Sequence, residues 1–282
     1  MRLPKIVIPS LLPLLFVGLN AQTIFSDNFD TLDGFTISPD PATATAGVTL
    51  VNSGTTPQNN AGTGNGMRVY DFDAVSGNEA ESSTNFSNPG QTAGIKVEFD
   101  YFNNDQHTGT FDIVRFGLAN EGSDPAAFAT IPFFVDFRSD DRIRVFFDGG
   151  NVLTASTGAS STAVSFALVV NPSTTESLSY TALDGSGQRT IGTETFDVYF
   201  DNTIVGTDPD GFDFLSAANY TPADGLGALG WFTGSAADID YTFDNLVVTS
   251  LIPEPSTYGA ILGAGALALC IYMRRRSKCT RV

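Results

Sequence analysis

Cysteine, histidine and tryptophan are scarce in this chain of 282 residues. The two cysteines, Cys270 and Cys279, lie near the C-terminus, so residues 22–251 form no disulfide and offer no thiol for catalysis. A single histidine, His107, excludes a zinc site built from several histidines and lies in a polar segment that we predict to be an exposed turn. Trp231 has no tryptophan partner for a sugar-stacking platform, and we predict that it lies in the core.

Basic residues are also few, with 14 Lys and Arg against 31 Asp and Glu. Seven of the basic residues lie in the two terminal segments, whereas residues 22–251 hold the other seven and 30 of the acids, a net charge of about −23. This charge excludes nucleic acid as a partner, because binding to phosphates needs a basic patch. It is compatible with divalent cations or with solubility outside a cell.

The C-terminal segment 252–282 has three parts in a fixed order. Residues 253–257 begin with Pro253, Glu254 and Pro255; residues 258–273 are apolar and uncharged; and the basic tail 274–282 begins with Arg274, Arg275 and Arg276. As a helix the apolar part is about 24 Å long, somewhat short for a bilayer core of about 30 Å. An amphipathic surface helix would need a polar stripe, which is missing. We therefore predict a transmembrane helix over residues 258–273, with the arginines in the cytoplasm.

The N-terminus predicts export. Arg2 and Lys5 precede an apolar stretch over residues 6–19, and Ala21 provides a small residue at a cleavage point. This order is typical of a secretory signal peptide, which we place at residues 1–21. The start of the signal peptide and the basic tail at the C-terminus would then both lie in the cytoplasm. Residues 22–251, between them, would lie outside the membrane.

The C-terminal segment resembles the PEP-CTERM sorting signal. The resemblance rests on Pro253-Glu254-Pro255, the short apolar helix and the cluster Arg274–Arg275–Arg276. It implies that exosortase, a membrane-embedded cysteine protease-transpeptidase of Gram-negative bacteria that secrete polysaccharide, recognises the Pro-Glu-Pro motif and cuts the chain. The arginines would be the cytoplasmic stop. The resemblance covers only residues 253–278 and implies nothing about the rest of the chain.

Residues 22–251 predict an all-β domain. Short alternating, β-branched or aromatic runs recur between clusters of Gly, Asn, Asp and Ser. The runs are residues 23–29, 67–72, 95–102, 111–118, 133–137, 143–147, 164–170, 177–183, 195–200, 226–232 and 241–249. No repeat of fixed period supports the main alternative, a parallel β-helix. We therefore predict an antiparallel jelly-roll-type β-sandwich.

Two segments resemble the concanavalin A-like (laminin-G-like) jelly rolls. They are the hairpin at residues 196–205, which turns at Asp201-Asn202, and the closing strand at residues 241–249. The resemblance implies that the first and last strands pair, which would place residues 24–29 beside residues 243–248.

The acids do not form a recognisable catalytic motif. Glycosidases need two carboxylates, and Glu98 and Asp100 alternate on one predicted strand, with Asp112 and Asp136 on others. The E-x-D-x-x-E arrangement of jelly-roll glucanases lacks its second Glu here, because Asn103 occupies that position. No G-x-S-x-G sequence is present either. We therefore predict that the chain is not an enzyme, with a glycoside hydrolase as the least favoured alternative.

Calcium is a candidate ligand of one acidic loop. Asp208, Asp210 and Asp213 surround Gly211, and oxygen-rich turns of this kind suit a hard cation. The loop departs from the helix-loop-helix calcium pattern, and a plain surface turn is the alternative interpretation. A second acidic set, Asp27, Asp30 and Asp244, becomes a candidate if the terminal strands pair.

The sequence thus predicts an exported surface or extracellular-matrix protein that is tethered to the membrane and processed by exosortase. We expect the β-sandwich to be a structural or adhesive component. The main alternative is a carbohydrate-binding module, calcium-dependent or not, whose partner would be an extracellular polysaccharide.

Overall fold

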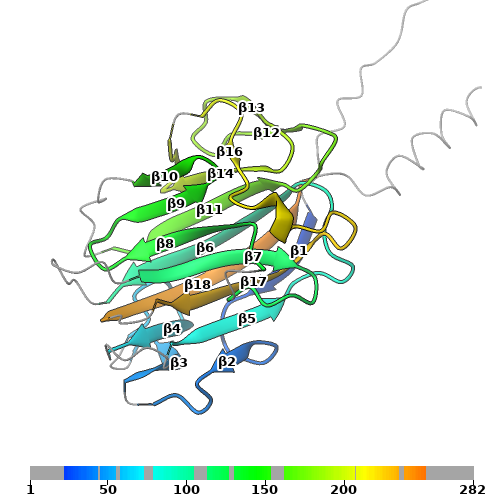
Figure 1. Cartoon of the computed structure of the whole chain (residues 1–282). Coiled ribbons are helices and arrows are strands. Elements are labelled where there is room, and N and C mark those ends of the chain that lie inside the picture. The colour runs from blue at the N-terminus through cyan, green and yellow to red at the C-terminus, as the bar shows by residue number, and fades with distance from the viewer. Residues whose placement is uncertain are drawn as a thin grey trace, which may run out of the picture. The chain divides into compact units, whose positions relative to one another are not determined.

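The computed structural model describes residues 22–43, 45–54, 58–72, 79–104, 113–126, 130–153, 162–206, 208–234 and 238–251. These residues form antiparallel sheets, and residues 21–252 make up one compact unit. Figure 1 shows two layers of strands, which is the β-sandwich architecture that the sequence predicts. The predicted signal peptide (residues 1–21, with the cleavage point at Ala21) and the sorting segment (residues 252–282) lie outside the described residues.

The larger sheet has nine strands, and its main path runs in the order β15-β14-β11-β6-β18-β4-β3, with β1 beside β18 and β16 beside β14. Its strands are β1 (Gln22–Asp27), β3 (Ala46–Asn52), β4 (Asn65–Asp71), β6 (Ile95–Asn103), β11 (Val164–Asn171), β14 (Thr195–Phe200), β15 (Thr203–Ile204), β16 (Phe212–Asp213) and β18 (Ile239–Ser250).

The smaller sheet has seven strands in the order β10-β9-β8-β7-β17-β5-β2. They are β2 (Thr36–Ser38), β5 (Glu81–Asn85), β7 (Ile113–Asn120), β8 (Phe133–Arg138), β9 (Ile143–Phe147), β10 (Gly150–Leu153) and β17 (Leu226–Thr233). A separate hairpin consists of β12 (Leu178–Thr181) and β13 (Gln188–Ile191), and one 3₁₀ helix, η1, covers Ala217–Asn219.

The first and last strands pair as predicted. β1 runs antiparallel to β18, with Gln22 opposite Ser250 and Asp27 opposite Leu246. β18 also pairs with β6 and β4, so it lies in the interior of the nine-stranded sheet (Figure 1). Residues from both ends of the domain therefore hold the same sheet together, which leaves fewer bare strand edges.

The predicted hairpin near residue 200 is also confirmed. β14 pairs with β15 through Phe200 and Thr203, and the turn between them is Asp201-Asn202. Both turn residues have positive φ, 46° for Asp201 and 58° for Asn202. Asp and Asn tolerate this left-handed conformation better than most residues, and a turn of this hand matches the twist of the two strands.

The core lies between the two sheets and is rich in aromatic side chains. Trp231 is fully buried, as predicted, and its ring lies 5.1 Å from Phe116 and 5.3 Å from Phe243, measured between centroids. Phe99, on β6 of the nine-stranded sheet, links the two layers, because its ring lies 5.1 Å from Phe116 and 5.4 Å from Trp231 of the seven-stranded sheet. Since no cysteine is available here, burial of these rings provides the stabilisation that disulfides give many exported domains.

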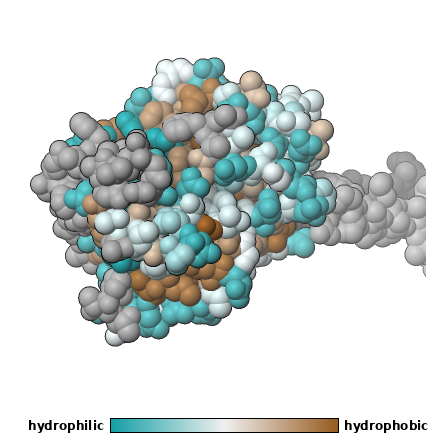
Figure 2. Space-filling view, turned by 60° about the horizontal axis from the view of Figure 1, so that its bottom comes forward, coloured by the Kyte–Doolittle hydropathy of each residue, from teal (hydrophilic) through white to brown (hydrophobic). Residues whose placement is uncertain are grey.

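Large apolar side chains at the surface are few. Among the described residues these are Leu50 of β3, Leu153 of β10, and Phe72 and Leu215 outside the strands, each about two-fifths exposed. Figure 2, which brings the side with β2 and β3 forward, shows apolar residues there interrupted by polar ones. The described part of the chain contains no helix that combines the length and apolar composition of a membrane span.

Candidate functional site

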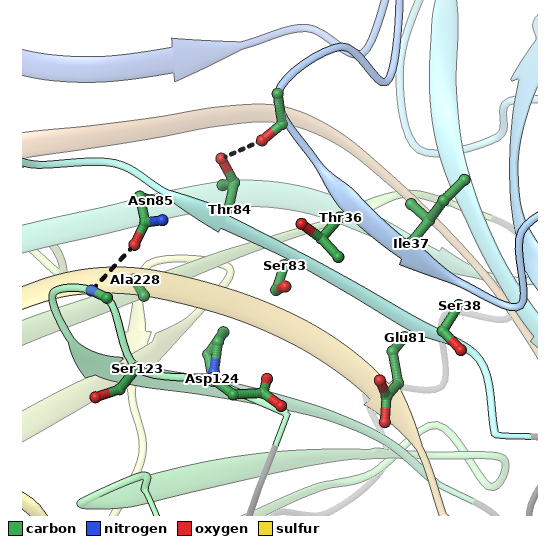
Figure 3. Close-up of a pocket in the computed structure, with 13 residues that line it drawn as sticks. Thr36, Ile37, Ser38, Glu81, Ser83, Thr84, Asn85, Ser123, Asp124 and Ala228 are labelled. Atoms are coloured by element: carbon green, nitrogen blue, oxygen red, sulfur yellow. Dashed lines mark hydrogen bonds between the residues drawn. The ribbon is translucent and has the colours of Figure 1, made fainter.

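A polar pocket of about 320 Å³ opens on the outer face of the seven-stranded sheet. We call it the β5 groove, because β5 forms its floor together with β2 on one side and the loop at residues 122–125 on the other. Figure 3 shows the side chains of Thr36, Ser83 and Asp124 around the same space. Its volume lies within the range of pockets that bind small molecules.

The strand β5 carries polar side chains on both faces. Those on the inner face form hydrogen bonds within the domain, and those on the outer face line the groove. Ser82 points inward, where its hydroxyl donates to Met67 Sδ at 3.2 Å. Thr84 Oγ1 donates to the carbonyl oxygen of Gly34 at 2.8 Å, which ties β5 to the turn before β2 (Figure 3). Glu81 and Ser83 alternate with these residues and therefore face outward, into the groove.

The loop that forms the second wall is held against the sheet. The amide of Gly122 donates to Asn85 Oδ1 at 3.3 Å, and the amide of Ala126 donates to Asp124 Oδ1 at 2.9 Å. Gly230 of β17 allows the loop to approach closely, because a Cβ atom at this position would lie 2.9 Å from Pro125 Cγ. The wall is therefore set by packing onto the sheet as well as by hydrogen bonds.

Several groove side chains are available to a ligand. Within the described residues, Thr36, Ser38 and Ser83 make no side-chain hydrogen bond, and the carboxylate of Glu81 has no hydrogen-bond or ion-pair partner. Figure 3 shows Glu81 and Asp124 extending from opposite sides toward the same space. Burial raises the pKa of Glu81 above its ordinary value, and the charges of Asp124 and Glu79 raise it further.

This set of groups suits the chemistry of sugars. Hydroxyl groups both donate and accept hydrogen bonds, and ionised carboxylates accept strong hydrogen bonds from sugar hydroxyls. Pairs of carboxylates are also the groups that hydrolyse glycosidic bonds when their separation is suitable. The sequence did not predict this site, because β5 contains no apolar residue and β2 is only three residues long.

The predicted calcium loop is organised differently from a metal site. Asp208 Oδ1 accepts the amide of Asp210 at 3.1 Å, its carbonyl oxygen accepts Arg189 Nη2 at 2.7 Å, and Asp213 lies in β16 opposite Thr195. Among the described residues no three Asp, Glu, His or Cys side chains form a group that could hold a metal ion. The structure therefore does not bring the carboxylates of Asp208, Asp210 and Asp213 together as ligands.

The same result applies to the acidic set near the terminal strands. β1 and β18 do pair, but the carboxylate of Asp244 is occupied by Asn59 Nδ2 at 3.0 Å and by the amide of Asn245 at 2.7 Å. Burial raises the pKa of Asp244 and also that of Asp27. The carboxylate of Asp27 accepts the amide of Phe29 at 2.6 Å, so both Asp27 and Asp244 have hydrogen-bond partners within the domain.

Two of the acids weighed for a glycosidase, Glu98 and Asp100, lie on the same face of β6, but both already have partners, and a third acid lies on the other sheet. Glu98 and Asp100 lie on β6 of the nine-stranded sheet, where Glu98 pairs with Lys96 and Asp100 accepts hydrogen bonds from Ser165 and Asn245. Asp136 lies on β8 of the other sheet. His107 and Asp112 lie outside the described residues.

The fold is shared with carbohydrate-active proteins. A sialidase matches with a TM-score of 0.53 and 13% identity over 81% of this chain, although the chain spans only 19% of that protein. A carbohydrate esterase from the Shiga toxin-encoding bacteriophage phi24B matches with a TM-score of 0.50 and 12% identity, over 82% of this chain and 99% of the esterase. No family model and no curated protein matches the sequence.

These matches correct the prediction that the chain is not an enzyme. The same fold occurs in a carbohydrate esterase and within a sialidase, so it is a fold that enzymes use. The prediction relied on missing sequence motifs, and such motifs exclude only particular active-site designs, because catalytic residues are grafted onto a fold in many ways.

Proposed function

We propose that residues 22–251 form a carbohydrate-recognition domain that binds sugar in the β5 groove. The observation that carries the proposal is the set of unpartnered polar side chains, Thr36, Ser38, Ser83 and Glu81, gathered in one pocket on the outer face of a sandwich. Thr36 and Ser38 are exposed and Ser83 and Glu81 are half-buried, so a ligand in the pocket can reach all four, and among the described residues none of them has to give up a protein partner to bind it. The fold shared with two carbohydrate-active proteins supports the same conclusion.

Filling the groove is expected to abolish sugar binding. Ser83 lies on the floor of the pocket, so Ser83→Trp would occupy the space that a sugar ring needs. The wild-type chain would be screened against a glycan array, and the affinity of the best ligand would then be measured by calorimetry for both proteins. We expect a loss of at least about a hundredfold in affinity, since few of the polar contacts would survive.

Ser179→Trp provides the matched control. Ser179 is an exposed residue of β12, where its hydroxyl contacts Thr190 Oγ1 at 2.8 Å, and it takes no part in the groove. This variant should bind sugar like the wild type. Equal affinity of the Ser83→Trp variant and the wild type would refute the groove as the binding site.

We further propose that the C-terminal segment delivers this domain to the outside of the cell. The support is the ordered motif of Pro253, Glu254 and Pro255, the uncharged residues 258–273, and the basic cluster that follows. Exosortase and the membrane would then be partners in processing, and a secreted polysaccharide would be the ligand that the exported domain meets. A sugar-binding domain and a signal associated with polysaccharide secretion are consistent with each other.

Processing is expected to remove the residues beyond the Pro-Glu-Pro motif. Mass spectrometry of the mature protein from hosts with and without exosortase would measure this directly. Replacing Arg274, Arg275 and Arg276 with Ala should reduce processing, because the positive charges keep the helix from slipping outward. If the residues after Pro255 are retained equally in both hosts, a permanent membrane anchor replaces the sorting proposal.

A further inference from the structure

Every basic residue of the domain already has an acidic partner. All seven Lys and Arg between residues 22 and 251 lie in described parts of the chain, and each makes an ion pair. The pairs are Arg68 with Asp240, Lys96 with Glu98, Arg115 and Arg144 with Asp136, Arg138 and Arg142 with Asp140, and Arg189 with Asp197. None of these ion pairs includes Glu81 or Asp124, so among the described residues the acids of the β5 groove have no positive partner.

The groove concentrates negative charge where no described basic residue lines it. Glu81 and Asp124 are both among its lining residues, and within the described part of the chain the carboxylate of Asp124 accepts one hydrogen bond, from the amide of Ala126 to Oδ1. The basic residue nearest across the strands is Arg115, two strands away through Phe232, and its Nε is bonded to Asp136 at 2.7 Å. The raised pKa of Glu81 is consistent with this uncompensated charge.

Building on the proposed function, we infer that the β5 groove selects sugars that carry a free ammonium group, such as unacetylated hexosamine units. The ammonium would lie between the carboxylates of Glu81 and Asp124 and donate to both. The hydroxyls of the ligand would meet Thr36, Ser38 and Ser83. Hydrogen bonds between charged groups are about twice as strong as neutral ones, so the amine contributes much of the selectivity.

The same charges exclude acidic sugars. A sialic or uronic acid would place a third carboxylate beside Glu81 and Asp124, and the charges are too close for salt to screen them. N-acetylation removes the positive charge of the ligand and leaves only neutral hydrogen bonds. The expected order of affinity is therefore free amine first, N-acetylated sugar second and acidic sugar last.

Calorimetry with matched oligosaccharides tests this order on the full-length chain in detergent. The probes are a glucosamine tetrasaccharide, its fully N-acetylated counterpart and a galacturonic acid tetrasaccharide, at about 0.15 M salt, where the Debye length is about 8 Å. We expect the amine form to bind about tenfold or more tightly than the acetylated form, and the acidic form to show no binding. Short ligands are used because a long polycation would also collect on the acidic surface.

Two isosteric variants locate the selectivity. Glu81→Gln and Asp124→Asn each remove one charge, and asparagine at 124 can still accept the amide of Ala126, so the loop should keep its shape. Each variant is expected to reduce the preference for the amine form severalfold, with little change for the acetylated form. Glu98→Gln removes one charge from the other sheet and should leave the preference unchanged. Melting curves would confirm that the variants are folded.

The outcomes separate this inference from the proposed function. Equal binding of the amine and acetylated forms, abolished in both cases by Ser83→Trp, would overturn the ammonium site and leave the sugar site intact. Loss of preference in Glu98→Gln as large as in Glu81→Gln would mean general attraction to an acidic protein, which also overturns the inference. Failure of every sugar on the array to bind would overturn the proposed function itself.

Discussion

Replacing Asp136 with asparagine is expected to lower the free energy of unfolding by about 3–5 kcal/mol, the range for a buried ion pair that loses one partner. The Asp136 side chain is fully buried on β8, between two arginines. One oxygen accepts Arg115 Nε at 2.7 Å, and the other accepts Arg144 Nη2 at 2.6 Å and Nε at 3.0 Å. An asparagine has no charge and only one acceptor oxygen, so it cannot serve both guanidinium groups.

The arginines cannot easily turn away to water. Arg115 lies over the ring of Phe134 at 4.5 Å and that of Phe232 at 5.3 Å, and its side chain is only 10% exposed. Arg144 lies over Phe146 at 4.6 Å. Because these stacking contacts fix the guanidinium groups, the loss of Asp136 leaves positive charge held in a partly dry environment.

Urea denaturation followed by circular dichroism would measure the change. The control is Glu98→Gln, which breaks the pair between Lys96 Nζ and Glu98 Oε2 at 2.8 Å. Since the Glu98 side chain is 36% exposed, this variant should lose less than about 1 kcal/mol. A loss in Asp136→Asn no larger than in the control would show that Asp136 does not stabilise the folded sheet.

The apolar strands could be predicted from the sequence, because runs of apolar, β-branched and aromatic residues mark the positions that are buried in a sheet. The predicted run at residues 143–147 matches β9, and the run at residues 195–200 matches β14. The pairing of the first strand with the last was predicted only through a resemblance, and the structure confirms it.

The groove could not be predicted, because the strand that forms its floor looks like a loop. Glu81–Asn85 reads Glu-Ser-Ser-Thr-Asn and has no apolar residue, since its inward positions are filled by Ser82 and Thr84, which bond to Met67 and Gly34. Its strand character comes from pairing with β2 and β17, which is tertiary information.

Choosing among the acids also required the fold. The domain holds 30 acids, and no local pattern tells which of them lack a cation. Asp136 stands out in sequence as a possible catalytic acid, yet it is the centre of an ion-pair cluster. Glu81 belongs to no sequence motif, yet it lines a pocket and has no hydrogen-bond or ion-pair partner among the described residues. In both cases the register between neighbouring strands determines whether the carboxylate lies beside a basic residue.

Replacing Trp231 with alanine is expected to lower the free energy of unfolding by about 3–5 kcal/mol, because the cavity removes packing that neighbours cannot recover. Trp231 is fully buried, and four aromatic rings surround it, from Phe29, Phe99, Phe116 and Phe243. These rings come from both sheets, so the cavity would lie where the two layers meet. The measurement is urea denaturation followed by circular dichroism.

Trp231→Phe distinguishes loss of packing from loss of a hydrogen bond. Among the described residues Trp231 Nε1 has no hydrogen-bond partner, so phenylalanine gives up volume but no polar contact. We expect this variant to lose less than half of the stability that Trp231→Ala loses, and to keep sugar binding, because the neighbouring Ala228 of β17 faces the groove on the opposite side of the strand. If phenylalanine were as damaging as alanine, the indole N–H would have to donate to an acceptor, and the all-apolar core around Trp231 would be wrong.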